Sequence, residues 1–155
     1  MTIVEVCDSE QLEVARGLFR AYAASLPFSL DFQGFDAELA GLPGAYAAPG
    51  GCLLLAMNGD KPVGVVGVKP LAPPDVAEIK RLYVAPDARG TGAGKGLAER
   101  AIAAARARSY RRVRLDTHRP SMEAAVALYC RLGFVEIAPY GPNPGGVFAF
   151  FEKEL

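Results

Sequence analysis

The sequence lacks an excess of charge of either sign and has few cysteines. Its 17 Lys and Arg residues are balanced by 17 Asp and Glu residues. A chain that binds nucleic acid or an anionic membrane through general electrostatics needs a basic excess, so we expect neither partner. Cys7, Cys52 and Cys130 are odd in number and far apart, which fits neither a disulfide framework nor a metal-ligand spacing. We therefore expect no metal, and we predict that each thiol packs as a small apolar group.

Long hydrophobic runs are missing as well. No stretch approaches the roughly 18 apolar residues of a membrane span. The start, MTIVEVCDSE, lacks the basic segment and apolar run of a secretory signal. With the unpaired cysteines, these absences predict a cytoplasmic protein. Hydrophobic residues nevertheless make up 51% of the 155 residues, enough for a sizeable core, and the length predicts a single domain over residues 1–155.

Apolar periodicity and turn signals predict the element order β-α-α-β-β-β-α-β-α-β-β. The expected strands are Thr2–Cys7, Cys52–Met57, Val63–Val68, Val76–Val84, Arg112–Asp116, Phe134–Ala138 and Val147–Leu155. The expected helices run from Asp8 to Pro27, from Asp36 to Leu42, from the glycines near residue 94 to about Ser109, and from Met122 to Leu132 with Ser121 as N-cap. Connections are expected at Asn58-Gly59 and at Pro70–Pro74. Hairpins and crossover helices together predict an α/β class with a mixed central sheet of about six to seven strands and about four helices.

The most informative stretch, VAPDARGTGAGKG, joins the strand Val76–Val84 to a helix through a glycine-rich turn. The first N–H groups of a helix have no partner inside it, and the helix dipole is positive there, so such a turn favours a phosphate ligand. Lys95 opposes that dipole unless an anion is present. A nucleoside-triphosphate P-loop is excluded because Arg89 replaces its first glycine and Gly96 its Ser or Thr. The dinucleotide fingerprint fails as well.

Arg89, Gly92 and Gly94 satisfy the pattern [QR]-x-x-G-x-[GA]. The stretch RLYVAPDARGTGAGKGLAERAIAAA resembles the pyrophosphate loop of the GNAT superfamily of acetyl-CoA-dependent N-acetyltransferases. The predicted element order is also that of the GNAT fold, so the resemblance covers nearly the whole chain. It is most specific from Glu78 to Phe134. It implies an acyltransferase that uses acetyl-CoA as co-substrate and passes the acetyl group to a primary amine by direct attack on the thioester.

The resemblance also implies which residues hold the co-substrate. It assigns the pyrophosphate to the backbone amides of Arg89, Gly90, Thr91, Gly92, Ala93, Gly94 and Lys95. It places the pantetheine arm along the strand end formed by Leu82, Tyr83 and Val84, with an amide near Val84 polarising the thioester carbonyl. Many relatives carry an asparagine at the position of Met122, so contacts on that side are expected to be fewer or to come from Ser121 or Arg119.

Two side chains are candidates for the proton transfers. An alkylamine with a pKa near 10 must lose a proton before it attacks. Glu78 stands where some family members carry a catalytic glutamate, and a regular strand would place Glu78, Lys80, Leu82 and Val84 on one face. The alternative is that Glu78 only pairs with Lys80 or an arginine.

Tyr129 lies in ALYCRLGF, which resembles the family signature A-x-L-Y-x-x-x-G-F, where the tyrosine often protonates the leaving thiolate. Its alternative is a core aromatic. Asp116 and His118, at the end of the next strand, are weaker candidates for the base. A histidine is attractive because it titrates near neutral pH, but His118 is the single histidine of the sequence. An acetyl-cysteine route through Cys130 ranks low, because adjacent helical residues point in different directions.

The acceptor cannot be named from the sequence, and it is expected across the sheet from CoA, near the first two helices and the late loop. A small-molecule amine or a peptide remains open. A closed pocket lined by the Phe28–Tyr46 segment would favour a small molecule, whereas an open groove would favour a protein N-terminus or lysine. The other alternative is a catalytically idle acyl-CoA-binding or sensing module. The edge at the last strand could support a homodimer.

Overall fold

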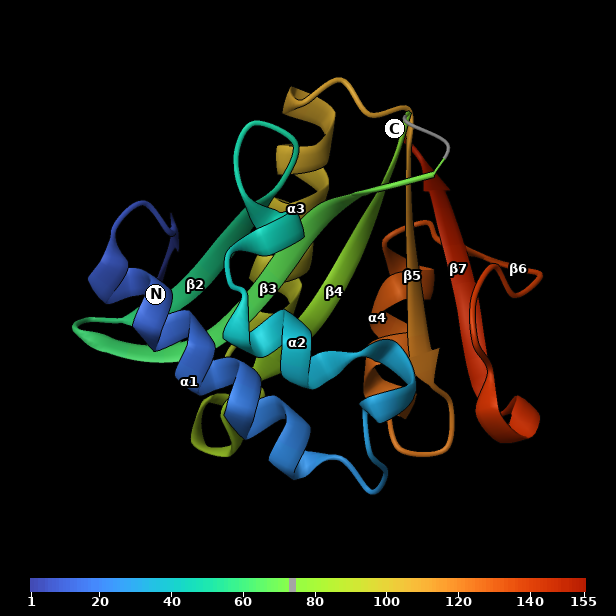
Figure 1. Cartoon of the computed structure of the whole chain (residues 1–155), viewed down its shortest axis with the longest axis horizontal. Helices are drawn as coiled ribbons and strands as arrows, with labels where there is room; N and C mark the ends of the chain where they lie inside the picture. The colour runs from blue at the N-terminus through green and yellow to red at the C-terminus, as the bar shows by residue number, and fades with distance from the viewer. Residues whose placement is uncertain (73–74) are drawn as a thin grey trace.

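A computed structural model, which describes residues 1–72 and 75–155, consists of a seven-stranded sheet with helices on both faces (Figure 1). The strand order is β1-β2-β3-β4-β5-β7-β6, so the expected edge at the last strand is wrong: β7 (Phe148–Glu154) is paired on both sides, and β6 forms the edge. β4 and β5 run parallel, and the other neighbouring strands run antiparallel. Helices α1 and α2 cover one face, and α3 and α4 cover the other (Figure 1). The predicted mixed α/β sheet is therefore confirmed.

The observed elements follow the predicted order, with boundaries moved by a few residues. The strands are β1 (Thr2–Glu5), β2 (Cys52–Asn58), β3 (Lys61–Leu71), β4 (Val76–Val84), β5 (Arg112–His118), β6 (Val135–Ile137) and β7 (Phe148–Glu154). The α-helices are α1 (Ser9–Ser25), α2 (Phe35–Ala40), α3 (Ala93–Ala107) and α4 (Glu123–Arg131). Short 3₁₀ turns are η1 (Asp31–Gln33), η2 (Gly44–Tyr46), η3 (Pro86–Ala88) and η4 (Pro144–Gly146).

Two local predictions differ from the structure. Part of the connection expected at Pro70–Pro74 belongs to β3, because Pro70 pairs with Ala77 of β4; residues 73 and 74 lie outside the described residues. Pairing with a long partner strand outweighs the loss of one proline N–H donor. Ser121 does not cap α4: Met122 occupies that position without a side-chain hydrogen bond, and Ser121 Oγ lies 2.7 Å from His118 Nδ1 instead.

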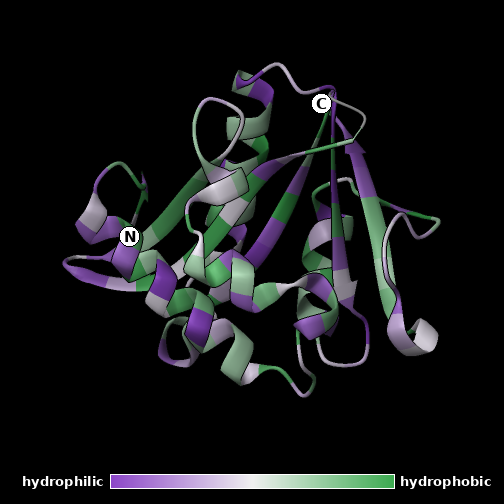
Figure 2. Cartoon of the chain, viewed as in Figure 1, coloured by the Kyte–Doolittle hydropathy of each residue, from purple (hydrophilic) through white to green (hydrophobic). Residues whose placement is uncertain are grey.

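The sheet separates two apolar clusters. Leu97 and Leu115 belong to the cluster under α3 and α4, whereas Phe19 and Leu55 belong to the cluster under α1 and α2. Figure 2 shows β2 and β3 as largely hydrophobic, while purple hydrophilic segments interrupt β4. No helix in the described ranges has the length and apolarity needed to span a bilayer.

The central strand β4 is bulged at Arg81. Arg81 has a φ of 62°, and the register between β3 and β4 shifts between Val65 and Gly67. Lys80 and Arg81 both make their contacts on the α1 and α2 side, whereas Leu82 packs on the α3 side. The predicted common face of Glu78, Lys80, Leu82 and Val84 is therefore wrong, because a bulge adds one residue and reverses the alternation.

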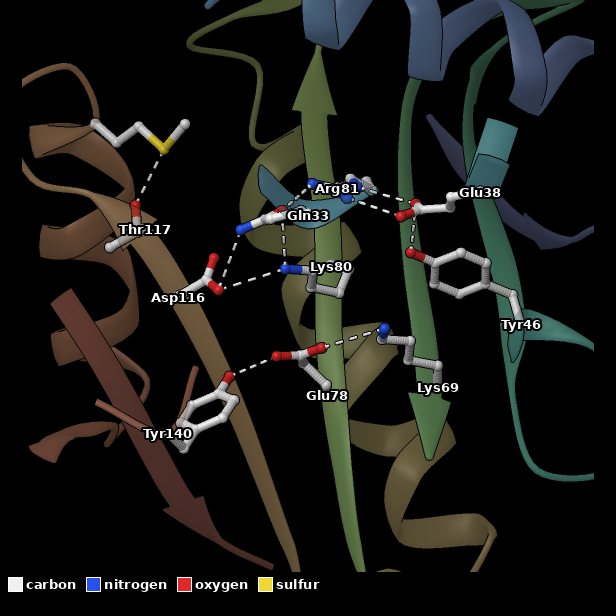
Figure 3. Close-up of polar contacts among 11 residues, drawn as sticks. Gln33, Glu38, Tyr46, Lys69, Glu78, Lys80, Arg81, Asp116, Thr117 and Tyr140 are labelled. Carbon is white, nitrogen blue, oxygen red and sulfur yellow. Dashed lines mark hydrogen bonds and ion pairs between the residues drawn. The ribbon is translucent and has the colours of Figure 1, made fainter. Parts of the chain in front are cut away.

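The bulge is held by a buried ion pair (Figure 3). The Arg81 guanidinium donates to both carboxylate oxygens of Glu38 at 2.7 and 3.0 Å and to Gln33 Oε1 at 2.7 Å. Tyr46 Oη donates to Glu38 Oε2 at 2.8 Å. Burial raises the pKa of Glu38, but the hydrogen bonds and charge of Arg81 outweigh it and leave this pKa below its ordinary value. These contacts fix α2 and its flanking turns to β4.

The parallel strands β4 and β5 separate soon after they begin. They pair only at Val76–Arg112, Ala77–Val113 and Glu78–Arg114. Beyond Glu78 the edge of β4 that faces β5 has no partner strand within residues 1–72 and 75–155. Figure 1 shows the two strands diverging toward their carboxyl ends. The unpaired edge of β4 ends at Val84, shortly before the glycine-rich turn and α3.

The ion pair generates a prediction for stability. Replacing Glu38 by alanine leaves the Arg81 side chain, which is only 2% exposed, without its counter-charge. We expect Glu38→Ala to lower the free energy of unfolding by about 3–5 kcal/mol, measured by urea denaturation. The control is Glu136→Ala, which removes an exposed ion pair to Arg119 and should cost less than about 1 kcal/mol. Equal losses in the two variants would contradict the role given to Arg81.

Candidate active site

The glycine-rich turn carries a row of unpaired backbone donors. Gly90 and Gly92 have φ angles of 80° and 87°, and Gly92 is the N-cap of α3. Within the described residues, the N–H groups of residues 90–95 donate neither to a backbone carbonyl nor to a side chain, and the first such bond is from Gly96 N–H to the Gly92 carbonyl at 2.9 Å. Positive φ values and a helix N-terminus together aim these donors outward, which is the chemistry of an anion site.

The side chains of the same turn add positive charge at its surface. Arg89 Nε donates to the Val84 carbonyl at 3.1 Å, so this side chain folds back over the end of β4. Lys95 is exposed, with Nζ 3.7 Å from Glu99 Oε1. The turn therefore fits a pyrophosphate by its unpaired donors and by the charge of Arg89 and Lys95.

Tyr129 lies on α4 in the core beneath the sheet. Its ring packs edge-on against Phe134, with centroids 5.6 Å apart. The hydroxyl has no hydrogen-bond partner among the described residues. Burial raises the pKa of Tyr129 well above its ordinary value, and Tyr22 and Asp116 act in the same direction. The phenol is therefore protonated at neutral pH and has a proton to donate.

Glu78 lies buried on the opposite face of the sheet, where two side chains hold its carboxylate (Figure 3). Tyr140 Oη donates to Oε2 at 2.6 Å, and Lys69 Nζ lies 3.6 Å from Oε1. Tyr140 belongs to the loop between β6 and β7, and it is fixed by an edge-on contact with Phe150 and by the Arg114 guanidinium over its ring. Burial, followed by the charge of Glu78, raises the pKa of Tyr140. The expected alternative partner of Glu78 was Lys80 or an arginine, but Lys69 takes that place.

Lys80 instead spans the gap between β4 and β5. Its Nζ lies 3.4 Å from Asp116 Oδ2 and 3.2 Å from Gln33 Oε1. Gln33 Nε2 is 3.5 Å from the same Asp116 oxygen. Asp116 is therefore paired. On the other side of β5, the Thr117 hydroxyl donates to the Met122 sulfur at 3.1 Å (Figure 3).

His118 stands apart from the carboxylates at the end of β5. Its ring lies 4.4 Å from the Phe28 ring and 5.2 Å from that of Phe148, measured between centroids. Phe32 completes this half-buried aromatic cluster through Phe148. Cys7 and Cys130 are exposed and only Cys52 is buried, so the prediction that each thiol packs as a small apolar group is wrong for two of the three. No group of three His, Cys, Asp or Glu side chains within the described residues is arranged to hold a metal ion.

A cavity of about 280 Å³ lies between α2, η2 and the sheet. It is lined by Gln33, Ala37, Glu38, Gly41, Pro43, Gly44, Ala45, Tyr46 and Lys69. Lys69 links this cavity to Glu78. Another hollow, of about 550 Å³, lies near Cys7, Cys52 and Arg108. Arg108 follows the last turn of α3, so that hollow is at the end of the helix opposite the glycine-rich turn.

Sequence reasoning did not identify Lys69, Gln33, Glu38 or Tyr140 as parts of this polar network. Glu38 and Gln33 belong to a segment without strong periodicity, and Tyr140 lies in a Pro/Gly-rich loop. One signal was present: Glu78, Lys80 and Arg81 are charged residues in a strand that is otherwise apolar, and buried charges require partners.

Comparisons with known proteins agree with this geometry. Residues 16–134 match the model of the acetyltransferase (GNAT) family. An N-acetyltransferase of Schizosaccharomyces pombe, itself uncharacterized, is 34% identical over 136 residues, which cover 87% of this chain and 83% of the relative.

Solved structures share the fold over nearly the whole chain. A GNAT-family acetyltransferase from Staphylococcus aureus Mu50 superposes with a TM-score of 0.75 at 22% identity, covering 99% of this chain and 98% of that one. The Salmonella typhimurium protein yncA, solved with its cofactor acetyl-CoA, gives a TM-score of 0.77 at 20% identity and covers 99% and 93% of the two chains. Fold, turn and relatives together show that the chain belongs to the GNAT acetyltransferase family and is an acyltransferase that uses acetyl-CoA.

Proposed function

We propose that this enzyme transfers the acetyl group of acetyl-CoA to the primary amine of a small molecule, by direct attack of the amine on the thioester. The observation that carries the proposal is the buried Glu78 carboxylate, whose partner Lys69 lines a cavity of about 280 Å³. The cavity is lined largely by the segment from Gln33 to Tyr46. The small volume of this cavity favours a small acceptor over a protein chain, which would need a longer groove.

The binding of acetyl-CoA is assigned to the glycine-rich turn and the free edge of β4. The unpaired N–H groups of residues 90–95 would hold the pyrophosphate, with Arg89 and Lys95 near it. Leu82, Tyr83 and Val84 would present their β5-facing backbone to the pantetheine arm, since no strand pairs with them there. When bound, acetyl-CoA supplies the activated acetyl group as a thioester, and an N–H near Val84 would stabilise the negative charge that develops on its oxygen.

Glu78 is assigned the role of general base, directly or through a water molecule. Its Oε2 accepts a hydrogen bond from the Tyr140 hydroxyl, whereas Oε1 faces Lys69 Nζ at 3.6 Å without a hydrogen bond and would accept the proton from the acceptor ammonium. A carboxylate fixed by two partners keeps one orientation and is ready for this transfer. Asp116 is a weaker candidate because Lys80 and Gln33 occupy it, and the His118 ring is packed among phenylalanines.

Tyr129 is assigned the role of general acid for the departing CoA thiolate. Its raised pKa keeps the hydroxyl protonated, and no described residue competes for that proton. Membership of a family of acetyltransferases favours this catalytic role over an idle acyl-CoA-binding module.

The first prediction for this function concerns the co-substrate. Thermal unfolding should shift upward by several degrees at a hundredfold excess of acetyl-CoA over its Kd, because binding to the folded state adds about 2.7 kcal/mol. Differential scanning fluorimetry measures the shift. No shift at millimolar acetyl-CoA would contradict the assignment of the turn.

A second prediction tests the turn itself. Gly92→Val forces a β-branched residue into a left-handed backbone conformation, so the N–H row should lose its geometry and the Kd for acetyl-CoA should rise at least tenfold. Isothermal titration calorimetry measures the Kd. Gly59→Val is the control, since it imposes similar backbone strain in the β2–β3 hairpin and should leave the Kd unchanged.

A third prediction tests the acid. Tyr129→Phe keeps the packing against Phe134 and removes only the hydroxyl, so stability and the Kd for acetyl-CoA should stay close to wild type. Turnover, followed by thiol release with an acceptor amine, should fall at least tenfold. Unaltered turnover would show that Tyr129 is a core aromatic only.

A further inference from the structure

We infer that the acceptor is a free α-amino acid with an uncharged side chain, whose amine binds Glu78 and whose carboxylate binds Lys69. This inference rests on the proposed function and specifies its substrate class. It is carried by the pairing of Lys69, which lines the 280 Å³ cavity, with the buried Glu78 carboxylate behind it.

The spacing of the two charges matches that of an amino acid. Lys69 of β3 and Glu78 of β4 are directly opposite each other in the strand register, and Lys69 Nζ lies 3.6 Å from Glu78 Oε1. In an α-amino acid the amine and carboxylate are attached to the same carbon, so their charged atoms lie about 3 Å apart. A zwitterion can therefore place its ammonium against Glu78 and its carboxylate against Lys69 at the same time.

Lys69 retains donors for such a ligand. Among the described residues its ammonium donates no hydrogen bond, and its contact with Glu78 is longer than the usual distance for a charge-assisted bond. The side chain of Lys69 is 28% exposed, whereas that of Glu78 is 6% exposed. Lys69 thus lies at the accessible side of the pair, where a carboxylate can reach it, and Glu78 lies further inside.

The rest of the cavity sets the side-chain preference. Glu38 is the other charged residue in its lining, and Arg81 and Tyr46 already occupy the Glu38 carboxylate. No unpaired charge in the described lining remains to bind a charged side chain. Gln33 and Tyr46 provide polar edges, and the alanines and Pro43 provide apolar wall, which suits a neutral side chain.

This arrangement disfavours a peptide N-terminus as acceptor. A peptide carries an amide at the position where a free amino acid carries its carboxylate, so Lys69 would gain no ion pair. A simple alkylamine has neither a carboxylate nor an amide at this position. Recognition by Lys69 therefore predicts a preference that is measurable within one set of related molecules.

The experiment compares leucine, leucinamide and 3-methylbutylamine as acceptors, followed by release of CoA thiol, with the same three forms of phenylalanine and methionine as parallel sets. We expect kcat/KM for the amino acid to exceed that for its amide at least tenfold in at least one set. In Lys69→Met this ratio should fall to about one, while Lys69→Arg should preserve it. The ratio of the two kcat/KM values reports carboxylate recognition alone. Lys69→Met also removes the partner of Glu78, but that loss slows the amino acid and its amide equally.

Lys153→Met is the matched control: it removes a lysine of β7 that lines neither cavity and should keep the wild-type ratio. An amide or amine used as well as the amino acid, or a ratio unchanged in Lys69→Met, overturns the inference while the proposed amine acetylation stands. Turnover of the amides or alkylamines with no turnover of any amino acid also overturns the inference and leaves the proposed amine acetylation standing. Absence of turnover with every amine, in a protein that binds acetyl-CoA, overturns the proposed function and the inference together.

Discussion

The ion pair between Arg81 and Glu38 is the interaction on which the α1- and α2-covered face of the sheet depends. A non-glycine residue with positive φ in the middle of a strand is strained, and it persists only where its surroundings compensate. Here the compensation is two hydrogen bonds to one carboxylate and a third to Gln33. The same contacts attach α2 and the turns around it to the sheet, so the position of the cavity wall follows from the conformation of one arginine.

Charges on this face are arranged as short pairs that cross from strand to strand. Lys69 and Glu78 join β3 to β4, and Lys80 and Asp116 join β4 to β5. Each buried carboxylate has a cation and a neutral donor, which limits the desolvation cost of placing it away from water. A neutral network of this kind can hold a carboxylate ready for proton transfer without concentrating charge of one sign, in agreement with a chain that has no net charge.

The sequence was sufficient for the order of elements, the sheet and the family, because these depend on periodicity, turn residues and the motif around Gly92. It was insufficient for the polar face of β4. The two-residue period assigned Leu82 and Val84 to the side of Glu78, and one inserted residue at Arg81 reversed that alternation. This bulge depends on Glu38 and Gln33, which are distant in sequence, so no local pattern around Arg81 predicts it. Partner choice failed for the same reason: Lys69 is nine residues from Glu78 along the chain but opposite it across the hairpin.

The divergence of β4 and β5 has a consequence for solvent. The free backbone edge of β4 lies inside the sheet, between two strands, and not at its outer rim. Water molecules must satisfy those N–H and C=O groups whenever nothing else does. Any molecule that binds along this edge has to replace the hydrogen bonds of that water. Because the edge lies between β4 and β5, it is also not available for pairing with a strand of another protein.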